Sequence, residues 1–124
     1  MTTLEAIRAE LEANTAVLAL VGTRIYPQAM PQGVTLPAVV ITVVSEVPEN
    51  SLTGTASTRL VQARAQVDCY AAKYLDAHQV AAAVDEVLAN LMRSDLSAER
   101  MDSRDLYDDE AGLHRVSADY SIWR

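Results

Sequence analysis

The chain has 124 residues, which is enough for one domain and too few for two, so we expect a single domain over residues 1–124. Half of the residues are apolar, which excludes an intrinsically disordered chain, and the formal net charge of −7 argues against sequence-independent binding of nucleic acid. Cys69 is the only cysteine, so no internal disulfide can form and synthesis in the cytoplasm is expected. The N-terminus lacks a basic region followed by an apolar core, and no apolar run approaches the ~20 residues of a membrane helix, so we expect no signal peptide and no membrane partner.

Two short helices are predicted at the start of the chain. Thr2 and Glu5 have the spacing of a capping box, in which both side chains bond to free backbone amides at a helix start. The helix that follows carries an apolar stripe at helical spacing, formed by Leu4, Ile7 and Leu11. A second short turn over residues 17–21 is expected to end at Gly22, because glycine adopts the left-handed C′ conformation at little cost. Residues 25–26 then add a brief extended piece.

The first long strand is predicted from Ala38 to Val47, because this segment is rich in β-branched residues. Residues 39–41 are apolar on both faces, which indicates a strand covered on one side by the protein's own helices and on the other by another subunit. Pro48 to Ser57 follow as a polar loop of about ten residues, longer than a tight hairpin needs. Long loops on rigid sheets carry contacts, so this loop is a candidate contact element.

The segment from Thr58 to Met92 gives the clearest pattern in the chain. Its first part alternates with a period of two, and one face of the predicted strand is formed by Val61, Ala63, Ala65, Val67 and Cys69. Beyond residue 72 the period becomes that of one helix face, formed by Val80, Val84, Val87, Leu88 and Leu91. Small side chains make a shallow surface on which a helix packs closely. We therefore predict that this helix lies on the apolar face of the strand.

Two further strands are predicted after the helix. A weak strand runs from about Arg100 to Tyr107, and residues 108–112 form a turn in which Gly112 adopts a positive φ. The last segment alternates again, with one face formed by His114, Val116, Ala118, Tyr120 and Ile122. The order α-α-β-β-α-β-β predicts an α+β fold, an antiparallel or mixed sheet of about four strands with two main helices packed on one face. The order of the strands across the helix crossover stays open.

No pattern in the sequence predicts a catalytic residue, a metal site or a cofactor. Two histidines do not make a metal site, and we expect His78 on a helix and His114 on a strand near the rim of the sheet. Cys69 is expected to be a buried structural thiol. The sequence contains neither G-x-S-x-G nor a glycine-rich phosphate motif, and residues 108–110 lack the spacing of a calcium loop. The sequence therefore does not favour an enzyme.

Several stretches, taken in order, resemble a known family. They are residues 18–27 (LALVGTRIYP), 36–40 (LPAVV), 64–71 (RAQVDCYA), 104–108 (RDLYD) and 112–123 (GLHRVSADYSIW). Together they resemble the tail completion proteins of long-tailed phages, also called tail terminator or head-to-tail joining proteins, which have related copies in prophages and gene transfer agents. Tyr70 departs from the pattern, because tryptophan is often expected there, but it keeps an aromatic side chain.

The resemblance implies a structural role in the virion, at the tail end or neck. Such proteins form a ring, usually a hexamer, on the end of the finished tail tube, where the ring stops tube growth and meets the connector on the head. The implied partners are therefore further copies of the chain, the tail tube protein and the head connector or neck protein. DNA would pass through the lumen without specific binding, and an acidic ring would repel its phosphates.

The candidate subunit contacts lie on the long loop and on the polar face and edge of the sheet. They are Pro48, Glu49, Asn50, Leu52, Arg64, Asp68, Arg104 and Asp105. A cyclic assembly uses two different patches on each subunit, and charges on the polar sheet face would pair across subunits. Two alternatives stay open: another phage neck or head-completion protein with a similar fold, and a small ligand-binding domain or enzyme. The second alternative requires a concave pocket with convergent polar groups.

Overall fold

The structure, a computed structural model, describes residues 2–49, 60–93 and 95–124. Within these residues the elements are α1 (Thr3–Glu12), α2 (Thr15–Val21), β1 (Ile25–Pro27), β2 (Ala38–Glu49), β3 (Leu60–Ala71), α3 (Tyr74–Ala89), β4 (Ser97–Asp108) and β5 (Leu113–Trp123). The predicted order of elements is confirmed. One short strand, β1, is added at the extended piece that precedes the loop of residues 28–37.

The strands form one mixed sheet in the order β1-β2-β3-β5-β4. β1 pairs with β2 in parallel, and all other neighbours pair antiparallel. The strand order that the sequence left open is settled by the β3–β5 pair, which places β5 in the sheet interior and β4 at the edge. The predicted α+β fold is confirmed, but the sheet has five strands rather than about four, because β1 pairs with residues 39–41 of β2.

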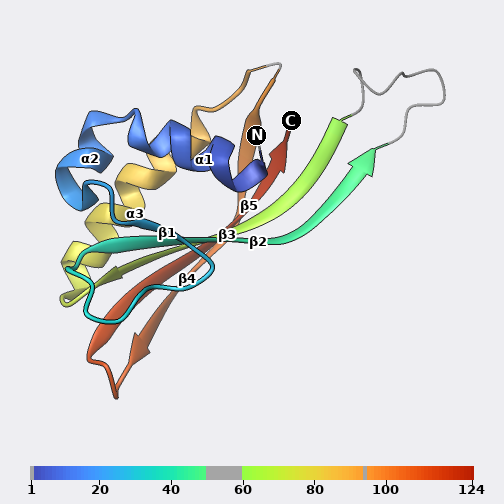
Figure 1. The fold of residues 1–124 in the computed structure, drawn as a ribbon. Helices are drawn as coiled ribbons and strands as arrows, with labels where there is room; N and C mark the ends of the chain where they lie inside the picture. The colour runs from blue at the N-terminus through green and yellow to red at the C-terminus, as the bar shows by residue number, and fades with distance from the viewer. Residues whose placement is uncertain (1, 50–59, 94) are drawn as a thin grey trace.

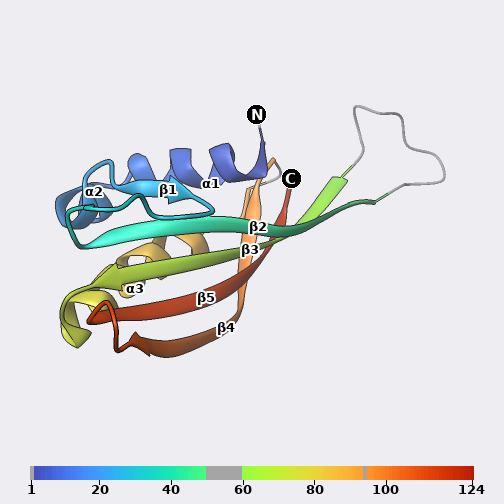
Figure 2. The same cartoon turned by 60° about the horizontal axis from the view of Figure 1, so that its bottom comes forward.

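The helices cover one face of the sheet (Figures 1 and 2). α1 packs against β2, α3 packs against β3, β4 and β5, and α2 packs against both other helices. The N-cap of α1 is at Thr2, as predicted, because the Thr2 hydroxyl accepts from the Glu5 backbone amide at 3.1 Å. The Glu5 carboxylate differs from the predicted capping box, because it accepts from the Thr2 hydroxyl and not from a backbone amide. α2 ends at Gly22, whose φ of 58° is readily adopted by glycine.

The end of β2 differs from the prediction. β2 continues two residues beyond Val47, because Pro48 and Glu49 pair with Val61 and Leu60 of β3. Assigning Pro48 and Glu49 to a loop was therefore wrong. Asn50 and Leu52 lie outside the described residues.

α3 lies on a strip of small side chains on β3, as the sequence predicts. This strip, at most 2% exposed, consists of Ala63, Ala65, Val67 and Cys69. The facing stripe of α3, in the same buried cluster, consists of Val80, Val84 and Leu88. Tyr120 of β5 is 1% exposed, and its hydroxyl donates a hydrogen bond of 2.9 Å to Asp85 of α3. Apolar packing and one hydrogen bond thus tie the helix to the sheet.

Two strands of the sheet, β2 and β4, each contain one bulge. The register shifts between Val43 and Ser45 in β2 and between Arg100 and Asp102 in β4. A bulge adds one residue to its strand, bends the strand and increases the local twist. Beyond the bulge in β2, the ends of β2 and β3 project past the helices (Figures 1 and 2). We call residues 44–49 and 60–64 the β2–β3 arm.

Replacing Leu88 by alanine should lower the free energy of unfolding by about 2–5 kcal/mol, because this fully buried side chain fills the space between α3 and the sheet. Urea unfolding followed by circular dichroism measures the change. Met92→Ala is the control, since Met92 is 83% exposed, and it should stay within about 0.5 kcal/mol of the parent. Equal stability of both variants would contradict the described packing of α3.

Candidate interaction surfaces

The face of the sheet opposite the helices is polar at its centre. Side chains on a strand alternate between faces, so Gln66 and Asp68 of β3 point away from the helices. On β5 the small polar residues Ser117, Asp119 and Ser121 share this face. Asp68 and these three residues are at most 8% exposed. Because the helices cover the other face, it is the surrounding side chains of the sheet that shield these groups from solvent.

Asp119 is held by two arginines of its own subunit. Its Oδ2 atom lies 3.6 Å from a guanidinium nitrogen of Arg64 and accepts a hydrogen bond of 3.3 Å from Arg104. Arg104 also donates to Asp102 at 3.0 Å, and these contacts, with Asp119 first, raise the pKa of Arg104. The predicted polar face therefore exists, and on it Asp119 is paired with Arg64 and Arg104 of its own chain.

Two other buried groups on this face have fewer partners. Both carboxylate oxygens of Asp68 accept from the Gln66 side-chain amide, at 3.2 and 3.0 Å. The Ser117 hydroxyl is fully buried and has no hydrogen-bond partner among the described residues. Ser117 pairs with Asp68 in the register of β3 and β5, so the two side chains are cross-strand neighbours.

β4 is an edge strand whose side chains are exposed on both faces. Every residue from Glu99 to Asp108 is exposed. Asp105 faces the helix layer, where its carboxylate lies 3.0 Å from Nε2 of His78 and accepts a hydrogen bond of 3.3 Å from Tyr74. The sequence prediction grouped Arg104 with Asp105, but alternation along the strand places them on opposite faces.

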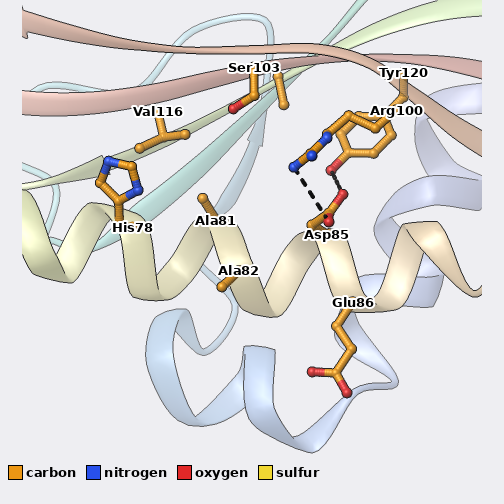
Figure 3. Close-up of a pocket in the computed structure, with 10 residues that line it drawn as sticks. His78, Ala81, Ala82, Asp85, Glu86, Arg100, Ser103, Val116 and Tyr120 are labelled. Carbon is orange, nitrogen blue, oxygen red and sulfur yellow. Dashed lines mark hydrogen bonds and ion pairs between the residues drawn. The ribbon is translucent and has the colours of Figure 1, made fainter.

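A pocket of about 310 Å³ lies between α3 and the β4–β5 pair (Figure 3). Asp85 is its central group, since it accepts from the Tyr120 hydroxyl at 2.9 Å and lies 3.5 Å from Arg100. Glu86 points away from these groups (Figure 3). The pocket has the convergent polar groups that a ligand site requires, but the central carboxylate is already bonded to groups of its own chain. The network therefore joins α3 to β4 and β5.

Burial dominates the titration of two groups near this network. The pKa of Tyr120 is raised, first by burial and then by its hydrogen bond to Asp85, so the hydroxyl remains a donor at neutral pH. Burial, and secondarily the charge of Asp68, raises the pKa of the Cys69 thiol to about 12. Cys69 is 2% exposed, as a structural thiol should be, and carries almost no thiolate at neutral pH.

The sequence analysis did not identify the side chains that gather at the start of α3. The ring of Tyr74 lies 4.4 Å from that of His78 and 5.9 Å from that of His114, and His114 also contacts Tyr107 at 4.6 Å between ring centroids. The spacing of Tyr74 and His78 by one helical turn was a local signal for part of this group. Its contact with β4 and β5 depends on how α3 lies on the sheet.

Searches of the described ranges for metal ligands and membrane spans are both negative. Across residues 2–49, 60–93 and 95–124, histidine, cysteine, aspartate and glutamate form no group of three that could hold a metal ion. In the same part of the chain, no helix has the length and apolar character needed to cross a bilayer.

Together these features define a class of protein. They are a small sheet with helices on one face, an exposed edge strand on which another chain can pair, and a projecting arm, which together fit a small protein that makes contacts at its periphery. Residues 5–124 match the family described as tail completion protein gp17, and the chain therefore belongs to this family. Membership of this family makes it a structural protein of the phage tail. The resemblance found in the sequence is thus confirmed.

Two solved structures share the fold. One is a chain in the virion of a native gene transfer agent particle, with a TM-score of 0.70 at 20% sequence identity, covering 98% of this chain and 92% of that chain. The other is the gp17 protein of bacteriophage SPP1, with a TM-score of 0.52 at 16% identity, covering 96% of this chain and 85% of that chain. No curated protein matches the sequence.

The stability of the protein should fall in alkaline solution because Cys69 titrates differently in the two states. Its ordinary pKa of 9.0 applies to the unfolded chain, and the folded value is about 12. The unfolded state therefore loses this proton first, so the stability from burying the neutral thiol is fully present below pH 9. It is lost between pH 9 and 12 at about 1.4 kcal/mol per pH unit. The raised pKa of Tyr120 lowers the free energy of unfolding further above pH 10.

Urea unfolding of the parent and of Cys69→Ala between pH 8 and 10 measures this effect. The free energy of unfolding should fall less with pH in the variant than in the parent, and equal falls would contradict the titration of Cys69 described above.

Replacing Ser117 by alanine should leave the free energy of unfolding unchanged or raise it by up to about 1 kcal/mol, because it removes a buried hydroxyl that lacks a partner among the described residues. Ser121→Ala on the same strand is the matched control, because the Ser121 hydroxyl donates to the sulfur of Met101 at 3.0 Å. Urea unfolding should rank Ser117→Ala as the more stable variant. The reverse ranking would show that the Ser117 hydroxyl is bonded in solution.

Proposed function

We propose that the chain forms a ring, with six subunits as the expected number, on the end of the finished tail tube. The ring ends tube elongation and joins the tube to the head connector. The match of residues 5–124 to the tail completion family is the observation that carries this proposal. The shared fold with a chain of a gene transfer agent virion supports it.

The surface of the subunit is compatible with cyclic assembly. A ring joins two different patches of each subunit, whereas a two-fold dimer joins one patch to itself. The described surface offers two distinct protruding elements, the exposed edge strand β4 and the β2–β3 arm. An edge strand with exposed side chains on both faces is a site where a neighbouring subunit adds contacts.

The candidate contacts from the sequence differ in how accessible they are. The side chains of Arg64, Arg104 and Asp105 are 51%, 41% and 50% exposed, so they are available to a neighbouring subunit. Pro48 and Glu49 lie at the end of the arm, and we retain Asn50 and Leu52, which follow them in the chain, as proposed contacts. Asp68 is 4% exposed, so we assign it the role of supporting this face from within.

The proposed partners follow from the position of the ring. One side of the ring contacts the tail tube protein and the other contacts the head connector or neck protein. DNA passes through the lumen without specific binding, because a chain with net charge −7 repels phosphates at long range. No catalytic activity is part of the proposal.

The proposal is tested by mixing the purified full-length chain with tail tubes of its own particle and imaging them by negative stain. Rings should appear at one end of each tube, and particles that lack the protein should carry tubes of uncontrolled length without heads. Binding to head portals instead of tubes would favour a head-completion protein. A chain that stays monomeric and never binds tubes would overturn the proposal.

Arg104→Ala should weaken ring assembly on tubes about fivefold or more, which corresponds to a loss of about 1 kcal/mol or more at a subunit contact. Arg8→Ala is the matched control, because Arg8 is an arginine of the same exposure, 40%, paired with Glu12 on α1. Sedimentation of tubes with bound protein over a concentration series measures both variants. Equal assembly by both would remove Arg104 from the contact.

A further inference from the structure

The exposed apolar side chains of this protein gather at two places. Of the nine large apolar residues that are exposed in the described part of the chain, six lie in two groups. Val44 and Val47, each 57% exposed, lie on the β2–β3 arm. The other group lies where α3 begins and β4 ends, and consists of Tyr74, Leu75 and Tyr107, with Leu106 beside Tyr107 on the opposite face of β4. Single exposed apolar residues are normal, but grouped ones mark interaction sites.

The bulge in β2 is the reason why Val47 is exposed. Before the bulge, Val39, Ile41 and Val43 face the helices. The extra residue reverses this alternation, so Glu46 pairs opposite Ala63 on the helix side and Val47 pairs opposite Gln62 on the other side. Glu46 then contacts Thr3 of α1. Without the bulge, Val47 would face the helix layer.

The second group surrounds a hollow of about 250 Å³, which we call the aromatic pocket. Its walls are formed by Tyr74 and His78 of α3, Tyr107 of β4, and His114 and Val116 of β5, and the charged residues Asp105 and Arg115 also line it. The ring contacts of His114 with Tyr74 and Tyr107 connect the walls. The volume lies below the roughly 300–1,000 Å³ of small-molecule sites, so the pocket suits one or two side chains better than a ligand.

The arm and the aromatic pocket lie at opposite ends of the molecule. In both views the arm projects at one end, and the start of α3 and the β4–β5 turn lie at the other (Figures 1 and 2). A projection and a hollow at opposite ends of one chain can join successive copies head to tail, which is the contact type that generates rings.

We propose that the β2–β3 arm of one copy inserts Val44 and Val47 into the aromatic pocket of the next copy. This inference rests on the proposed ring and names the two surfaces that close it. Copies with a net charge of −7 repel one another at long range, and a contact between uncharged side chains adds nothing to this repulsion. Among the exposed groups of the described residues, the arm valines and the pocket aromatics supply such a pair.

Cysteine crosslinking tests the contact directly. In Val47→Cys/Tyr107→Cys, a thiol-reactive bismaleimide should link neighbouring subunits of rings on tubes, giving a ladder of covalent oligomers in denaturing gels. Cys69 is buried with a pKa of about 12, so it does not contribute a background reaction. Met92→Cys/Tyr107→Cys is the control, because Met92 is exposed but lies outside both groups, and it should give no ladder. A ladder in the control alone would overturn the proposal.

Mixing two blocked variants tests the head-to-tail geometry. Val47→Asp and Tyr107→Asp each alter an exposed side chain and should fold, which circular dichroism verifies. Neither should form rings alone. Their mixture should form dimers, because the intact arm of one fits the intact pocket of the other and each dimer is left with one altered arm and one altered pocket.

The outcomes separate this inference from the proposed function. Rings of the parent chain together with unaffected rings of both variants would overturn the arm–pocket contact and leave the ring intact. Failure of the parent chain to form rings under any of these conditions would overturn both. Loss of rings in each variant with no dimers in the mixture would show that the two surfaces do not meet each other.

Discussion

The close approach of α3 to β3 is the contact on which the rest of the structure depends. The strand offers only short side chains along the contact, and Ala65 at its middle is completely buried. The helix therefore lies near enough for Asp85 to accept from Tyr120 and to meet Arg100. A larger side chain at Ala65 would displace the helix, because a packed core has no room for added volume. The same contact sets the pocket of Figure 3 and brings the start of α3 against the end of β4.

Covering only one face of the sheet determines how the surface is divided. On the uncovered face, the carboxylate of Asp119 forms ion pairs with Arg64 and Arg104 of the same subunit. The ends and the edge are not completed in this way. β4 is exposed on both faces, and the arm extends beyond the helices. A member of the tail completion family thus presents its unpaired apolar surface at its periphery, where contacts with neighbouring proteins cost the least desolvation of charge.

Local patterns explain what could be predicted from the sequence. The alternation along β3 and the helical stripe of α3 are visible because each depends on residues near one another in the chain. β1 has three residues and exists through its pairing with β2, which no local pattern reveals. Pro48 indicated a loop, although proline is tolerated beside bulges and on edges. Sequence reasoning grouped Arg104 with Asp105, which alternation along β4 places on opposite faces. It did not connect Asp85 with Arg100, because their contact depends on how α3 crosses the sheet.

The two bulges also shape the body of the subunit. Each bulged strand uses one more residue than its neighbour over the same paired length, and the strand therefore curves. The sheet bends accordingly, and the arm leaves the body at an angle to its other end (Figure 1). When bodies with non-parallel ends are joined in series, every addition turns the row by the same amount. For the ring that we propose, the curvature that two single extra residues give to the sheet is a geometric source of the rotation between successive copies.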